Sequence, residues 1–125
     1  MKKTIALLCL LAPLVPGCAS SGPPVASAQM TETELQIRSA ENAGATASAA
    51  ELLDRAQKAL AAARAAAARG ENDASRRLLE EAKAYAAAAE ARSNAERLKK
   101  QAAELRAQAD ELESKAKQLQ ERARP

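Results

Sequence analysis

Small apolar residues recur at helical spacing through the middle of the chain. Between residues 45 and 66 the spacings alternate between four and three, which places these residues on one face of an amphipathic helix. Leu53 and Leu60 widen the stripe, whose members are Ala45, Ala49, Leu52, Ala56, Ala59, Ala63 and Ala66. The pattern predicts a helix over about 49–69.

A second long helical segment follows after a short interruption. Gly70 is typical of the residue just past a helix end, and Asn72 or Asp73 can accept hydrogen bonds from the first amides of the next helix. From residue 74 to about 122 the chain has neither Gly nor Pro, which predicts one unbroken helix about 70 Å long at 1.5 Å per residue. So short a connection makes the two helices antiparallel neighbours.

The end of this helix carries a stricter seven-residue repeat. Alanines recur every seven residues and leucines follow each of them by three, which is the pattern of a coiled-coil seam. Such a stripe stays against a partner helix only if the two helices supercoil around each other. The members are Ala95, Leu98, Ala102, Leu105, Ala109, Leu112, Ala116, Leu119 and Ala123.

The apolar residues in the two halves of the long helix lie on different faces. Leu78 and Leu98 are 20 residues apart, which at about 100° per residue leaves them about 200° apart around the axis. One partner helix cannot cover both. We therefore expect residues 74–90 to pack on the preceding helix as a hairpin, while residues 95–123 present their seam elsewhere.

The tail has an alternative interpretation as a solvated helix without a partner. Ion pairs between residues four apart would support it, each by a few tenths of a kcal/mol. The candidate pairs are Glu96 with Lys100, Glu111 with Lys115, and Glu113 with Lys117.

A short first helix is predicted over about 32–43. Thr31 and Glu34 have the spacing of a capping box. Met30 and Leu35 stand at the two positions of a hydrophobic staple, which would set the direction in which the chain enters the helix.

Few residues are β-branched, so no strand is expected and the predicted fold class is all-α. Gly44 is the expected left-handed terminator of the first helix, and Ser48 with Glu51 forms a second capping box. The expected organisation is a signal peptide, a lipidated cysteine with a flexible tether, an alanine-rich helical hairpin region and a heptad coiled-coil tail, over residues 1–17, 18–29, 30–92 and 93–125.

The N-terminus has the three-part layout of a bacterial export signal. Lys2 and Lys3 precede about a dozen mostly apolar residues, too few for a membrane-spanning helix. The sequence of residues 15–18, Val15, Pro16, Gly17 and Cys18, resembles the lipobox of bacterial lipoproteins. The alternative is a secreted protein cut at the A-x-A site formed by residues 26–28.

The lipobox resemblance implies a covalent lipid anchor. Cys18 would carry a diacylglycerol thioether, the chain would be cut after Gly17, and the new amine would be acylated. Several acyl chains make a lasting anchor where one gives only marginal binding. In diderm lipoproteins an Asp after the cysteine commonly retains the protein in the inner membrane. Here Ala19 stands at that position and implies the outer membrane.

Charge and composition argue against several function classes. Cleavage would remove Lys2 and Lys3, leaving 17 basic residues against 16 acidic ones, which does not indicate nucleic-acid binding. The chain has no His, and Tyr85 is its only aromatic residue. Its carboxylates lie in charged helical patterns without metal-ligand spacing. We therefore expect no catalytic residue, no metal, no cofactor and no small-molecule substrate.

The lipobox, the alanine-rich hairpin of residues 49–91 and the alanine-rich tail resemble a family of small bacterial envelope lipoproteins known only as a domain of unknown function. The resemblance covers about residues 32–105. It implies an all-helical fold and an envelope location, and some members of that family occur with OmpA-like peptidoglycan-binding modules. The chain also resembles the major murein lipoprotein, although it ends "ERARP" rather than in the linking lysine.

Together these features predict a structural or adaptor lipoprotein, anchored in the outer membrane by Cys18 and extending its helices into the periplasm. The predicted partners are a second copy, another helical envelope protein or peptidoglycan-associated proteins, bound along residues 95–119. The competing interpretation is a lipid-surface protein whose helices lie flat on the membrane. Against it, the stripes are mostly Ala, with neither Trp nor Phe to insert.

Overall fold

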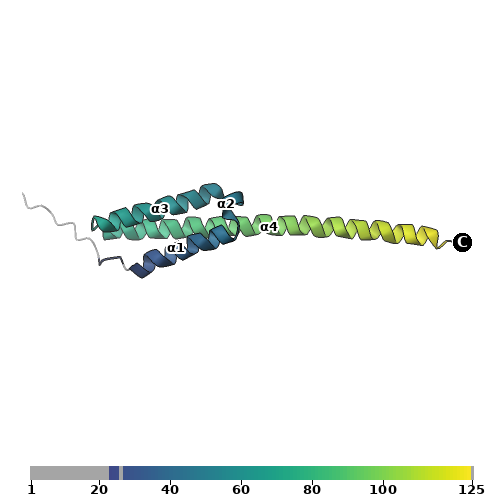
Figure 1. Cartoon of the computed structure of the whole chain (residues 1–125), viewed down its shortest axis with the longest axis horizontal. Helices are drawn as coiled ribbons and strands as arrows, with labels where there is room; N and C mark the ends of the chain where they lie inside the picture. Colours follow the sequence, from purple (N-terminus) through teal and green to yellow (C-terminus); the bar gives the residue numbers. More distant parts are fainter. Residues whose placement is uncertain (1–22, 26, 125) are drawn as a thin grey trace, which may run out of the picture.

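The computed structural model describes residues 23–25 and 27–124, and within them it is helical without strands, which confirms the all-α prediction. Its helices are α1 (Ser27–Asn42), α2 (Ala45–Ser48), α3 (Ala50–Ala68) and α4 (Asn72–Arg122). Figure 1 shows α1 and α3 lying along the first half of α4, while the second half of α4 projects alone to the C-terminal end.

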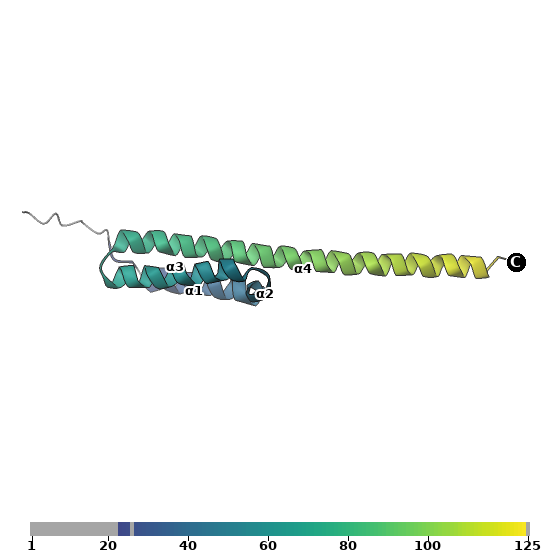
Figure 2. The ribbon, with the colours of Figure 1, turned by 90° about the horizontal axis from the view of Figure 1, so that it is seen from above.

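The predicted hairpin of α3 and α4 is present, and α1 joins it to make a three-helix bundle. α1 contacts both long helices, and Figure 2 shows α1 and α3 together on one side of α4. α1 runs parallel to α4, because Pro23 just before α1 accepts a hydrogen bond from Arg76, while Glu32 further along approaches Lys83 to 3.4 Å. The N-terminal end of α1 therefore lies at the same end of the bundle as the α3–α4 turn.

The bundle core consists mainly of alanine. Its larger apolar residues are Ile37, Leu53, Leu60 and Leu79. Of the two adjacent leucines at the start of α4, Leu79 takes the core position, while Leu78 is partly buried and packs against the edge of the core. Small side chains let the helix axes approach closely but bury little apolar area at each contact. The buried alanines are Ala40, Ala45, Ala49, Ala56, Ala59, Ala63, Ala66, Ala82, Ala86 and Ala89.

The start of α1 differs from the prediction. α1 begins at Ser27 rather than near residue 32, so residues 27–29 belong to a helix and not to the expected tether. The Thr31 hydroxyl donates to the Ser27 carbonyl one turn earlier, so Thr31 is inside the helix and is not a cap. Leu35 is exposed and makes no staple. Packing against α4 extends the helix beyond its local signals.

The turns before α2 and α4 follow the predicted glycines, but Ser48 does not cap α3 as predicted. Gly44 and Gly70 have φ values of 93° and 75°, as a left-handed helix terminator requires. Ser48, the expected cap of α3, instead donates a hydrogen bond to the buried Ser93 hydroxyl at 2.8 Å. α4 starts at Asn72, and Glu71 before it makes no side-chain capping hydrogen bond. The prediction that Ser48 caps α3 was therefore wrong.

Ser93 is the last buried residue of α4, and the bundle ends at this level. Its hydroxyl donates to the Ala89 carbonyl at 2.8 Å while accepting from Ser48, so the pair joins α2 to α4. None of the helices between residues 27 and 122 is long and apolar enough to cross a membrane.

Candidate interaction surface

Beyond Ser93, α4 continues as a helix that no other described element covers. Every residue from Arg97 to Arg124 is exposed. Helix-forming residues and ion pairs along the surface stabilise this tail locally. Lys115 lies 2.6 Å from Glu111 and Lys117 lies 2.7 Å from Glu113, as predicted.

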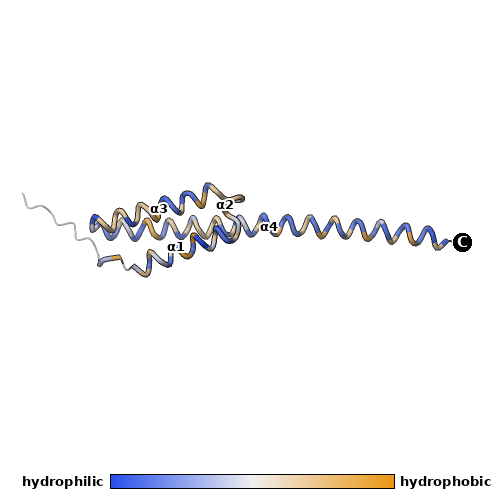
Figure 3. Tube along the Cα trace, in the orientation of Figure 1, coloured by the Kyte–Doolittle hydropathy of each residue, from blue (hydrophilic) through white to orange (hydrophobic). Residues whose placement is uncertain are grey.

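The tail carries a regular apolar stripe. We call it the tail seam and define it as Ala95, Leu98, Ala102, Leu105, Ala109, Leu112, Ala116, Leu119 and Ala123. The exposed fraction of the leucine residues is 60% for Leu98, 64% for Leu105 and Leu119, and 66% for Leu112. Figure 3 shows hydrophobic positions recurring among hydrophilic ones along this part of α4. Covering one such leucine would contribute about 1–2 kcal/mol, because full burial of the side chain is worth about 1.5–3 kcal/mol.

The tail seam faces away from the bundle. Counted from the buried Ser93 at about 100° per residue, Ala109 is turned about 160° around α4 and Leu112 about 100°. The exposed Ala84, Ala88 and Ala91 continue the same heptad positions along the back of the bundle. A helix docked on the tail seam would therefore not meet α1 or α3.

Charged and amide side chains flank the tail seam. One flank carries Lys99, Arg106, Glu113 and Gln120, and the other carries Gln101, Gln108, Lys115 and Arg122. At the start of the tail Glu96 pairs with Lys99 at 3.0 Å rather than with Lys100, so that predicted pair was wrong. Hydrogen bonding from Lys99, together with its positive charge, lowers the pKa of Glu96. The flanks are thus polar on both sides of a narrow apolar line.

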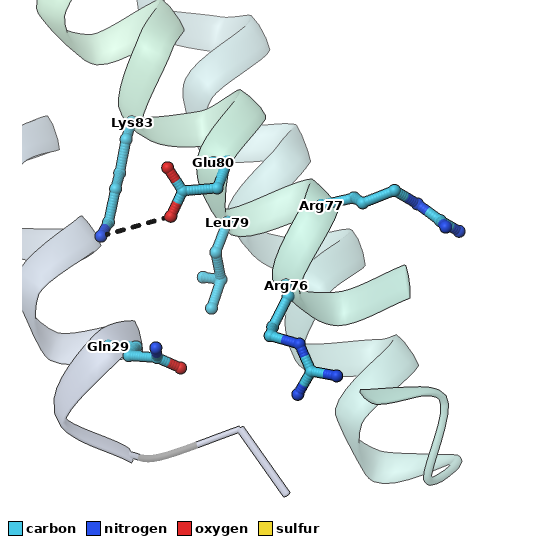
Figure 4. Close-up of a pocket in the computed structure, with 6 residues that line it drawn as sticks. All are labelled: Gln29, Arg76, Arg77, Leu79, Glu80 and Lys83. Carbon is cyan, nitrogen blue, oxygen red and sulfur yellow. Dashed lines mark ion pairs between the residues drawn. The ribbon is translucent and has the colours of Figure 1, made fainter. Parts of the chain in front are cut away.

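A pocket of about 340 Å³ lies between the start of α1 and the first turns of α4 (Figure 4). Lys83 in its wall pairs with Glu80 at 3.6 Å and with Glu32. Arg76 donates to the Pro23 carbonyl at 2.6 Å, and Figure 4 shows Arg77 turned away from the other lining side chains. These cations are held by groups of the protein itself or point outward, so the pocket is a weaker binding candidate than the tail seam. Leu79 and Gln29 complete its lining.

The sequence-predicted sites fall into two groups. Val15, Pro16, Gly17 and Cys18 lie outside the described residues. The residues of the seam are all exposed, from Ala95 to Leu119 on α4 and Ala123 just past its end, as the heptad pattern predicts. Sequence reasoning missed the continuation at residues 84, 88 and 91, although the same heptad frame extended backwards finds it. Within the described part of the chain, no group of His, Cys, Asp or Glu could hold a metal ion.

The family described as "Domain of unknown function (DUF4398)" matches residues 28–105. The matched region contains the three-helix bundle and the first part of the tail seam, up to Leu105. The chain matches no curated protein and no solved structure.

Proposed function

The chain belongs to the DUF4398 family of domains of unknown function, and we propose that it is a lipid-anchored structural or adaptor protein of the bacterial cell envelope. In this proposal Cys18 is lipidated and held in the outer membrane. The three-helix bundle stands at the membrane, and the tail seam is the contact surface in the periplasm.

The observation that carries the proposal is the regular leucine stripe on a helix held clear of the bundle. Isolated exposed leucines are common on protein surfaces, but a stripe sustained over four heptads on one face is typical of a coiled-coil partner surface. No contact within the described chain accounts for its regularity. A solvated helix without a partner would be stabilised by the ion pairs on its other faces alone and would not require a leucine stripe.

The placement of the anchor supports the same role. Pro23 is bonded to Arg76 near the start of α4, so a lipid on Cys18 would hold that end of the bundle at the membrane. At 1.5 Å per residue, Leu98 then lies about 40 Å further along α4 and Leu119 about 70 Å. The bundle therefore separates the seam from the anchored end along the length of α4.

The proposed role has no catalytic step. The carboxylates flanking the tail are exposed and several are paired with lysines, as at Glu111 and Glu113. An exposed, paired carboxylate lacks the desolvation that tunes a catalytic acid or base. We assign no cofactor beyond the covalent acyl chains on Cys18.

The anchor is tested by replacing Cys18 with serine in cells supplied with radiolabelled palmitate. We expect loss of label and release of the protein from the membrane fraction, because the thioether cannot form. Cys9→Ser is the matched control and should keep both, since Cys9 lies within the apolar run of the signal. Label and membrane retention in Cys18→Ser would refute the anchor.

The competing role, a helix lying on the lipid surface, is tested without the anchor. Because the whole described core lies between Val25 and Ala89, a segment covering residues 23–125 retains the bundle. Our proposal expects this segment to stay in the supernatant with vesicles of phosphatidylethanolamine and phosphatidylglycerol. Binding that is lost in Leu105→Lys/Leu112→Lys would support the competing role instead.

A further inference from the structure

We propose that the tail seam binds a second copy of this chain, with the two α4 tails running antiparallel. The inference shares with the proposed function the choice of the tail seam as contact surface. It does not depend on the lipid anchor, because every residue that it uses lies in the described part of α4.

The distribution of large and small residues favours the antiparallel direction. In an antiparallel pair each alanine of one heptad can face a leucine of the other chain, so every layer has the same volume. The register centred between Asp110 and Glu111 pairs Leu98, Leu105, Leu112 and Leu119 with the partner's Ala123, Ala116, Ala109 and Ala102, respectively. Facing large with small side chains lets layers interdigitate at a constant axis separation.

A parallel pair would pack the same residues poorly. Each leucine would then face the partner's leucine, and each alanine the partner's alanine. The separation of the axes that suits Leu105 against its copy would leave a gap at the next layer, where Ala109 would face its copy. Such gaps forfeit dispersion contacts along the whole seam.

The flanking charges favour the same arrangement. In the register centred between Asp110 and Glu111, Arg106 lies beside the partner's Glu113, and the two-fold symmetry repeats this pair. Lys99 lies beside the partner's Gln120. On the other flank Gln101 and Gln108 lie beside the partner's Arg122 and Lys115. Two attractive pairs and no like-charge pair result, and such flanking contacts set partner orientation in coiled coils.

Other arrangements lack this complementarity. In a parallel pair Arg106 would face the partner's Gln101, and Glu113 would face the partner's Gln108, which gives no ion pair. Sliding the antiparallel register by one heptad in one direction brings the two copies of Arg106 together, although Lys99 then lies beside the partner's Glu113. Sliding it in the other direction brings the two copies of Glu113 together, and like charges repel.

The bundle leaves room for this partner. At about 100° per residue from Ser93, the alanines of the tail seam are turned about 120–200° around α4 and its leucines about 80–140°. In the proposed register the helix end at Arg122 lies opposite the partner's Lys99, beyond the last buried residue, Ser93. The two bundles therefore stand at opposite ends of a rod. The starts of the two α4 helices are about 115 Å apart at 1.5 Å per residue.

Orientation and register are tested by disulfide formation in the segment of residues 23–125, which contains no native cysteine. Leu105→Cys protein mixed with Ala116→Cys protein should give a crosslinked heterodimer on mild oxidation, because these positions face each other. Leu105→Cys alone should crosslink little, since its two copies lie about 16 Å apart along the axis. Leu105→Cys mixed with Ala109→Cys reports the register displaced by one heptad.

The charge pair is tested by sedimentation equilibrium of the same segment. Arg106→Glu should weaken the dimer about tenfold, because it turns two attractions into two repulsions. Adding Glu113→Arg should restore the affinity, which only the proposed register allows. Arg97→Glu, which makes the same charge change on another face of the tail, is the matched control and should leave the affinity unchanged. Circular dichroism confirms that each variant stays helical.

Three results would overturn the proposal. They are a Leu105→Cys homodimer that forms faster than the mixed pair, a charge reversal that the second substitution does not rescue, and a segment that stays monomeric at millimolar concentration. Loss of palmitate labelling in Cys18→Ser tests the anchor separately, so a failed dimer and a failed anchor are distinguishable.

Discussion

Leu79→Ala should destabilise the three-helix bundle by about 3 kcal/mol. Leu79 is 2% exposed and belongs to a core whose other large apolar residues are Ile37, Leu53 and Leu60. Leucine-to-alanine changes in cores cost about 2–5 kcal/mol, as lost transfer free energy plus a cavity term. The surrounding alanines are too short to refill the space. Because the pocket beside Leu79 lets neighbouring side chains relax into the space that the leucine leaves, we expect the loss of stability to lie in the middle of that range.

The loss should be measured by urea unfolding with two probes. Tyr85 is the only aromatic residue of the chain. It is half-buried in the bundle and lies beneath Arg55, whose guanidinium is 5.8 Å from the ring centre. Its fluorescence therefore reports on the bundle alone, whereas circular dichroism also detects the tail. A loss of about 3 kcal/mol is a large share of the 5–15 kcal/mol that small domains possess.

Leu105→Ala is the matched control, since it removes the same atoms from an exposed site on the tail. In dilute, monomeric protein it should change the free energy of unfolding of the bundle by less than about 0.5 kcal/mol. If Leu79→Ala leaves the midpoint of the Tyr85 transition unchanged, or if the control lowers it equally, the assignment of the core is refuted.

Three further predictions concern single positions. Gly44→Ala should cost about 1 kcal/mol in thermal stability, because φ is 93° while the space around a new Cβ is open; an unchanged melting temperature would contradict the left-handed turn. Ser75→Ala should cost about 1 kcal/mol in the same assay, since its hydroxyl donates to the Ala63 carbonyl at 2.9 Å within the core, and a neutral result would mean that this bond adds nothing. An NMR titration should place the pKa of Glu96 below 4.5, and Lys99→Met should raise it. Because the pKa is lowered in the folded helix, the stabilisation by this carboxylate is complete above about pH 4.5 and fades as the pH falls through the lowered pKa.

The sequence by itself determined the features that depend on neighbouring residues along the chain. Helix propensity and periodicity located α3 and α4, and Gly44 and Gly70 marked the turns because only a left-handed residue ends a helix in that way. The heptad repeat found the tail seam, since a period of seven is a property of spacing alone.

Only the tertiary structure decided which residues of one helix are covered by another helix. Local signals began α1 near residue 32, but packing on α4 carries the helix back to Ser27. Ser48 looked like a cap from its spacing to Glu51, yet its hydroxyl turns to Ser93, which is 45 residues away. Leu78 and Leu79 are equivalent by hydropathy, and the angle at which α1 and α3 meet α4 buries Leu79. Packing also determines that the contacts of α1, α2 and α3 with α4 stop at the level of Ser93, which leaves the tail seam exposed. Contacts between helices depend on how distant segments are placed relative to one another, and no local pattern encodes that placement.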